Sequence, residues 1–144
     1  MHAASFLGRG FSVVTTLGRT TGRTRDLVAH YGMSRFCRGV HACEIAVLAL
    51  ETDPAARATI TEVAAAALEQ DGSDAIVLGC AGMADLCAEI SAELGVPVVD
   101  GVAAATVFVQ SLVTMNLATG ARGEFAAPGP KPYTGLLSGF GSGS

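Results

Sequence analysis

The chain has 144 residues, of which 50% are hydrophobic and 15% are charged, and its formal net charge is -4. This length favours one domain with a sizeable core. The acidic balance argues against a nucleic-acid-binding surface, and no apolar run is long enough to span a membrane.

The chain's first residues and its cysteines bear on its location. The segment that follows Met1 lacks the basic region and long apolar run of a secretion signal. The four cysteines form neither a CxxC pair nor a zinc-binding spacing. We therefore expect reduced thiols, no metal site and a cytoplasmic location.

The first half of the chain alternates strand-like and helix-like segments. Residues 10–16 predict a strand, and residues 24–31 predict a helix with Thr24 as its N-cap. The intervening run of glycine, arginine and threonine lacks the glycine spacing and the lysine of a phosphate-binding loop, so we predict no nucleotide site. Residues 40–50 predict a second strand, and Asp53 and Pro54 predict the start of a helix that ends at Gly72.

The second half repeats this alternation and then changes in composition. Residues 75–78 and 96–99 predict two more strands, with a helix over 83–94 between them and another over 102–117 after them. Alternating strands and helices predict an α/β fold with a doubly wound, mostly parallel four-stranded sheet that has helices on both faces. We expect this domain to cover residues 1–117 and a Gly/Pro-rich extended arm to cover 118–144, with a disordered end from about residue 139.

The strongest candidate for chemistry is Cys80, which directly follows the predicted strand 75–78. Gly79 and Gly82 on either side allow a sharp turn and close approach of a ligand to the backbone. A helix N-terminus favours the thiolate form of a nearby cysteine. The alternative interpretation is a buried structural thiol, because free cysteine is among the most buried residue types.

Two hydroxyl residues, Thr15 and Thr16, end the first predicted strand. In doubly wound sheets, ligands bind beyond the carboxyl ends of the strands, where the strand order reverses. If the first and third strands are neighbours, both threonines face the same crevice as Cys80. Asp100 also follows a strand, and its expected role is to cap the next helix.

Several segments resemble the hydantoin and allantoin racemase branch of the aspartate/glutamate racemase superfamily. The most specific one is the Gly-Cys-Ala-Gly-Met block at 79–83. The others, in chain order, are Val-Val-Thr-Thr-Leu at 13–17, Leu-Ala-Leu-Glu at 48–51, Gly-Val-Pro-Val-Val-Asp-Gly-Val-Ala-Ala-Ala at 95–105 and Pro-Lys-Pro-Tyr-Thr-Gly at 130–135.

The resemblance implies cofactor-independent racemisation at the carbon next to a carbonyl of a cyclic ureide. In that family, one cysteine removes the α-proton and a second cysteine, from a similar lobe, returns a proton to the opposite face. By this resemblance Cys80 is the catalytic thiol, and the expected substrate-binding residues are Thr15, Thr16, Gly79, Ala81 and Gly82.

One departure from the family pattern leaves alternatives open. The family's first lobe and its cysteine have no counterpart before Met1, so the chain resembles either a truncated racemase or an enzyme with a single thiol. The alternatives are a decarboxylase or isomerase of the same superfamily, or a non-catalytic remnant that binds a ligand or self-associates. We expect a small-molecule substrate and a homo-oligomer, because a missing lobe would expose the apolar 102–117 helix.

Overall fold

The computed structural model describes residues 1–129 and 133–141. The Pro-Lys-Pro part of the predicted closing motif and the last three residues therefore lie outside the described residues. The chain forms two compact units, Met1–Val109 and Gln110–Ser144. The domain boundary predicted at 117/118 lies within the second unit.

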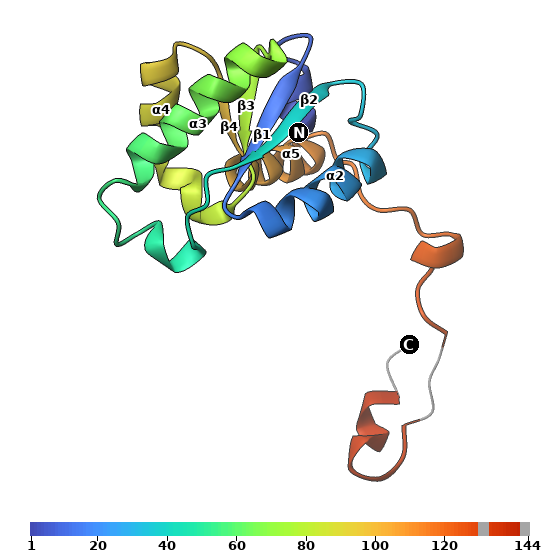
Figure 1. Ribbon diagram of the computed structural model, residues 1–144. Helices are drawn as coiled ribbons and strands as arrows, with labels where there is room; N and C mark the ends of the chain where they lie inside the picture. Colours follow the sequence, from blue (N-terminus) through green and yellow to red (C-terminus); the bar gives the residue numbers. More distant parts are fainter. Residues whose placement is uncertain (130–132, 142–144) are drawn as a thin grey trace. The chain divides into compact units, whose positions relative to one another are not determined.

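The first unit contains the predicted alternation of strands and helices (Figure 1). The strands are β1 (Phe11–Thr15), β2 (Cys37–Ala42), β3 (Ala75–Leu78) and β4 (Val98–Asp100). The α-helices are α1 (His2–Ser5), α2 (Thr21–His30), α3 (Ala56–Asp71), α4 (Cys87–Leu94) and α5 (Gly101–Thr114), of which α5 continues into the second unit. The 3-10 helices are η1 (Gly18–Thr20), η2 (Val47–Ala49) and η3 (Ala81–Leu86).

The four strands form one parallel sheet in the order β2-β1-β3-β4. From β1 the chain first adds β2 on one side, and it then crosses to the other side to add β3 and β4. The strand order therefore reverses between β1 and β3, where Val14 pairs with Leu78. This topology confirms the predicted α/β fold class and the predicted adjacency of the first and third strands.

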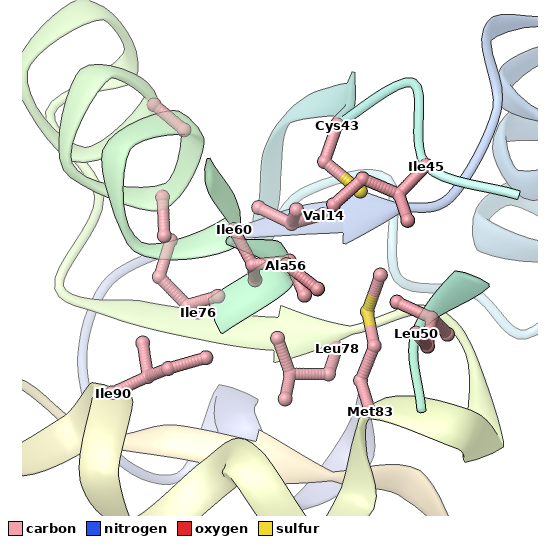
Figure 2. Packing of buried hydrophobic residues seen from close by; sticks show 12 residues of the cluster. Val14, Cys43, Ile45, Leu50, Ala56, Ile60, Ile76, Leu78, Met83 and Ile90 are labelled. Atoms are coloured by element: carbon pink, nitrogen blue, oxygen red, sulfur yellow. The ribbon is translucent and has the colours of Figure 1, made fainter. Parts of the chain in front are cut away.

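Helices cover both faces of the sheet. Successive side chains of β1 and β3 point to opposite faces, so they contribute alternately to two core clusters, one on each face. On one face, Val14, Ile76 and Leu78 pack with Ile60 of α3 and Ile90 of α4 (Figure 2). On the other face, the alternate strand residues pack against α1 and α2; they are Phe11, Val13, Ala75 and Val77, together with Ala4 and Val28. The two clusters fix the positions of the loops at both ends of the sheet.

Two helix ends are confirmed at the predicted glycines. Gly72 after α3 and Gly95 after α4 have φ angles of 62° and 67°. These angles lie in the left-handed region, which glycine adopts without the steric cost that a Cβ atom adds.

Several predicted element boundaries were wrong, and the local backbone structure explains three of them. Helix α2 begins at Thr21 rather than at residue 24, because η1 leads directly into it, so Thr24 lies inside the helix. Asp53 accepts a hydrogen bond from the N–H of Ala55 at 2.9 Å, and this turn delays the start of α3 to Ala56. The strand predicted over 40–50 is β2, which ends at Ala42 because Glu44 adopts a left-handed conformation with φ of 56°.

Two further differences concern the segments after β3 and β4. The helix predicted over 83–94 is divided into η3 and α4. The strand predicted over 96–99 is β4, and the helix predicted over 102–117 is α5, which begins one residue earlier and ends at Thr114.

The second unit has little regular structure beyond the end of α5. Its two 3-10 helices are η4 (Gly123–Phe125) and η5 (Gly135–Gly141), where the sequence predicts an extended arm. Its exposed apolar side chains include Leu112, Val113, Leu117, Phe125 and Phe140. Among the described residues, none of the helices is both long enough and apolar enough to cross a membrane.

Candidate active site

The loops after β1 and β3 meet at the carboxyl edge of the sheet. The N–H of Gly79 donates a hydrogen bond to the carbonyl of Val14 at 2.8 Å, which extends the β1–β3 pairing by one residue. Thr15, Thr16 and Cys80 therefore follow two neighbouring strands at the point where the strand order reverses, which is the expected position of a ligand site in this architecture.

Cys80 lies at this carboxyl edge of the sheet and is partly exposed. Its backbone is extended, with φ of -140° and ψ of 133°, and it is the N-cap residue of η3. It lines a cavity of about 250 Å³ together with Gly79, Ala81 and the first residues of α5. Cys80 also packs against the core cluster that contains Leu50 and Cys43, so this residue lies between the cavity and the core.

The residues around Cys80 leave little space for larger side chains. A Cβ atom at Gly79 would lie 3.2 Å from Thr15 Cβ, and a Cβ atom at Gly82 would lie 3.0 Å from Leu50 Cδ1 and 3.9 Å from Cys80 Sγ. Ala81 and Gly82 open η3, and the first N–H groups of a helix have no acceptor within it.

The two threonines predicted to bind substrate are buried. Thr15 is 3% exposed and Thr16 is 4% exposed. Thr15 Oγ1 is hydrogen-bonded to Thr20 Oγ1 at 3.0 Å, and the carbonyl of Thr16 accepts a hydrogen bond from the N–H of Ile45 at 3.1 Å. Neither threonine is among the described residues that line the Cys80 cavity.

The threonine that does line this cavity is Thr24 of α2, and Leu27 of the same helix also lines it. The sequence predicts only a capping role for Thr24. The missed signal is the spacing of three residues between Thr24 and Leu27, which places both side chains on one face of a helix.

A carboxylate holds the start of α2 in place. Glu44 Oε1 accepts a hydrogen bond from the N–H of Gly18 at 2.8 Å. Glu44 does this from the left-handed conformation noted above, which is uncommon for residues other than glycine. The contact fixes the turn between β1 and α2, and therefore the helix that forms one wall of the Cys80 cavity.

Asp100 also borders the cavity, and its predicted role as a helix cap is confirmed. Its Oδ1 accepts a hydrogen bond from the N–H of Val102 at 3.0 Å, and its Oδ2 accepts one from the N–H of Ala103 at 2.7 Å. Both contacts satisfy N–H groups at the start of α5. Within the described ranges, no group of three or more His, Cys, Asp or Glu side chains is arranged to hold a metal ion.

The other three thiols differ from Cys80 in their surroundings. Burial raises the pKa of the thiols of Cys37, Cys43 and Cys87. Cys87 Sγ donates a hydrogen bond to the carbonyl of Val98 at 2.8 Å, and Cys43 Sγ donates one to the carbonyl of Thr16 at 3.6 Å. These contacts are typical of cysteines that pack in a core rather than react.

Comparison with known proteins identifies the family. A model of the Asp/Glu/hydantoin racemase family matches residues 1–109. The chain belongs to this family. The matched range coincides with the first compact unit, and it contains all the residues around Cys80 described above.

Curated relatives in the family include two hydantoin racemases. The chain is 44% identical over 137 residues to the one from Rhizobium meliloti, and the aligned region covers 94% of this chain and 56% of the relative. It is 38% identical over 142 residues to the one from Pseudomonas sp. (strain NS671), and the aligned region covers 98% of this chain and 57% of the relative. The chain thus spans little more than half the length of the relatives that it matches.

Solved structures in the family have the same fold. An allantoin racemase from Klebsiella pneumoniae aligns with a TM-score of 0.85 and 43% identity, over 98% of this chain and 58% of that structure. A glycine-to-cysteine mutant of arylmalonate decarboxylase, in a form associated with a sulfate ion, aligns with a TM-score of 0.59 and 25% identity, over 78% of this chain and 49% of that structure. The resemblance predicted from the sequence motifs is therefore confirmed at the level of family and fold.

Proposed function

We propose that this chain carries a proton-transfer site of a cofactor-independent racemase that acts on a hydantoin-like cyclic ureide or a related amino-acid derivative. The observation that supports this proposal is the position of Cys80, a partly exposed residue that lines a cavity at the reversal of strand order. Relatives at 38–44% identity that are named hydantoin racemases support the substrate class.

In the proposed reaction, the Cys80 thiolate removes the proton from the carbon next to the carbonyl. The C–H bond breaks, an S–H bond forms, and the electron pair of the C–H bond passes into the carbonyl group to give an enolate. The N–H groups of Ala81 and Gly82 are the proposed donors to the developing negative charge, in the manner of an oxyanion hole. Return of a proton to the carbon restores the thiolate and completes the exchange.

Inversion of configuration needs a proton donor on the opposite face of the carbon. Cys87 begins α4, it does not line the Cys80 cavity, and its thiol donates a hydrogen bond to the carbonyl of Val98. We propose that the second donor belongs to the part of the relatives that this chain does not match. Cys80 alone would then exchange the α-proton with solvent on one face.

The test is the optical rotation of an enantiopure 5-alkyl hydantoin during incubation with the protein. We expect the rotation to decay no faster than in buffer with this chain alone, and to decay faster once the remainder of a full-length relative is added. Cys80→Ser should abolish this effect, and Cys87→Ser is the matched control that should retain it. Decay at the wild-type rate with Cys80→Ser would contradict the proposal.

A second candidate is a decarboxylase that works with a single thiol. The structural similarity to the arylmalonate decarboxylase mutant favours it, because one cysteine protonates only one face of an enolate. Release of carbon dioxide from an arylmalonate by the wild-type protein, and its loss with Cys80→Ser, would support this candidate. A protein inert in both assays would be a non-catalytic remnant.

We also propose that the chain self-associates in the cytoplasm. Helix α5 is largely apolar and has no buried residue, and Val107 and Val109 are 57% and 60% exposed. Apolar helix faces are normally covered by a partner. Light scattering coupled to size exclusion would give the mass, and a monomer at all concentrations would contradict self-association.

A further inference from the structure

We propose that Thr24 is a substrate-contacting residue that accepts a hydrogen bond from a ring N–H of the cyclic ureide, across the cavity from Cys80. This inference rests on the proposed function and adds a determinant of substrate specificity to it. Thr24 is half-buried on α2 and lines the same cavity as Cys80.

The hydrogen bonding of Thr24 fixes what its hydroxyl offers to a ligand. Its Oγ1 donates to the carbonyl of Thr20 at 3.0 Å, and a carbonyl oxygen can only accept. The single hydroxyl proton is therefore committed, and the remaining lone pairs of the oxygen can only accept. Toward a ligand, this hydroxyl is therefore an acceptor.

The other polar side chains that line the cavity have different roles. Asp100 uses both of its carboxylate oxygens to cap α5, and Cys80 is the proposed base. A cyclic ureide has N–H groups on both sides of a ring carbonyl, so it needs acceptors as well as an oxyanion cradle. Each Asp100 oxygen keeps a second lone pair, so among these side chains Thr24 provides the uncharged acceptor beside the charged one of Asp100.

The wall that carries Thr24 is held in place by two contacts. The Glu44 carboxylate accepts a hydrogen bond from the N–H of Gly18. The hydroxyls of Thr15 and Thr20 are hydrogen-bonded to each other. The carbonyl of Thr20 accepts the hydrogen bond from Thr24. The acceptor is therefore positioned before substrate binds. A site that is built to hydrogen-bond a substrate group discriminates strongly against analogues that lack the group.

The test is protection of Cys80 from alkylation. Iodoacetamide adducts at Cys80 are quantified by mass spectrometry while a 5-alkyl hydantoin, or its analogue methylated at either ring nitrogen, is titrated against the whole chain. We expect half-protection of Thr24→Val to need about five- to tenfold more hydantoin than wild type. Thr24→Ser should behave as wild type.

The matched control is Thr61→Val on α3. Thr61 makes the same type of bond, from its hydroxyl to the carbonyl of Arg57 at 2.9 Å, and it does not line the Cys80 cavity. We expect this variant to protect Cys80 as wild type does. Circular dichroism of each variant confirms that it is folded.

Methylation of the ligand provides a second measurement that does not depend on any variant. One of the two N-methyl analogues should bind wild type about five- to tenfold more weakly, and Thr24→Val should be insensitive to that methyl group. Equal protection of wild type and Thr24→Val, or equal binding of all three ligands to wild type, would overturn the role of Thr24 while leaving the proposed function intact. A hydantoin that does not protect wild-type Cys80 at any concentration would overturn both.

Discussion

Removal of the Asp71 carboxylate should destabilise the fold in a pH-dependent way. Asp71 is the last residue of α3, and its side chain is 10% exposed. Its Oδ2 accepts hydrogen bonds from Ser12 Oγ at 2.5 Å and from His41 Nε2 at 2.7 Å. Ser12 is fully buried, so the carboxylate joins the amino end of β1, at Ser12, and the carboxyl end of β2, at His41, to the end of α3.

The size of the effect follows from these two contacts. Hydrogen bonds to charged groups contribute roughly 1.5 to 3 kcal/mol each, which gives about 3 to 6 kcal/mol for Asp71→Ala. Ser12 retains a contact with Ser73 Oγ at 2.7 Å, so the expected loss lies near the lower end, about 3 kcal/mol. The same substitution at the exposed residue Asp26 should change the free energy of unfolding by less than about 0.5 kcal/mol.

The pH dependence has a definite sign. Burial of the Asp71 carboxyl group opposes its ionisation, but hydrogen bonds from Ser12 and His41, together with attraction to His41, hold its pKa below the ordinary value. A carboxyl whose pKa is lower in the folded state stabilises the fold above the unfolded pKa of about 3.9. That stabilisation is lost as the pH falls through the lower folded value.

The assay is urea unfolding followed by far-ultraviolet circular dichroism. The difference in free energy of unfolding between wild type and Asp71→Ala should be about 3 kcal/mol near neutral pH, and it should shrink on acidification below about pH 3. A difference that is the same at both pH values would refute the role assigned to the ionised carboxylate.

Three further predictions concern packing and thiol access. Gly39→Ala should destabilise the fold by about 1 to 3 kcal/mol in urea unfolding, because the added Cβ would overlap the Asp71 carboxylate; an unchanged midpoint would contradict that packing. Ile90→Ala in the core should lower the free energy of unfolding by about 2 to 5 kcal/mol, whereas Leu48→Ala at an 89% exposed site should leave it almost unchanged. Equal melting temperatures of the two variants would refute the assignment of the core. Iodoacetamide should modify Cys43 more slowly than the other thiols, because it is 6% exposed and burial raises its pKa; early modification in a mass-spectrometric time course would contradict this order.

The sequence predicts those features of the fold that are encoded in short segments. The strand at 75–78 has the predicted bounds, and Gly72 and Gly95 end helices as expected, because apolar periodicity and the left-handed preference of glycine are local properties. The parallel sheet followed from the alternation of elements.

The details of the site depend on contacts between distant segments, which the sequence does not reveal. Glu44 reaches from the end of β2 to Gly18, and this contact sets where α2 begins. The substrate contact of Thr15 stays a prediction: its side chain is buried and its hydroxyl is paired with Thr20, while Thr24 lines the cavity. Side-chain partners of this kind become visible only when the tertiary structure is known.

The proposed role of Cys80 is to exchange the proton at the carbon next to the carbonyl. The most direct measurement is proton NMR of a 5-alkyl hydantoin in heavy water, which reports replacement of that single hydrogen by deuterium. We predict exchange faster than in buffer with the wild-type chain, and exchange at the buffer rate with Cys80→Ser. Undiminished exchange with Cys80→Ser, or no acceleration by the wild-type chain, would contradict this role of Cys80.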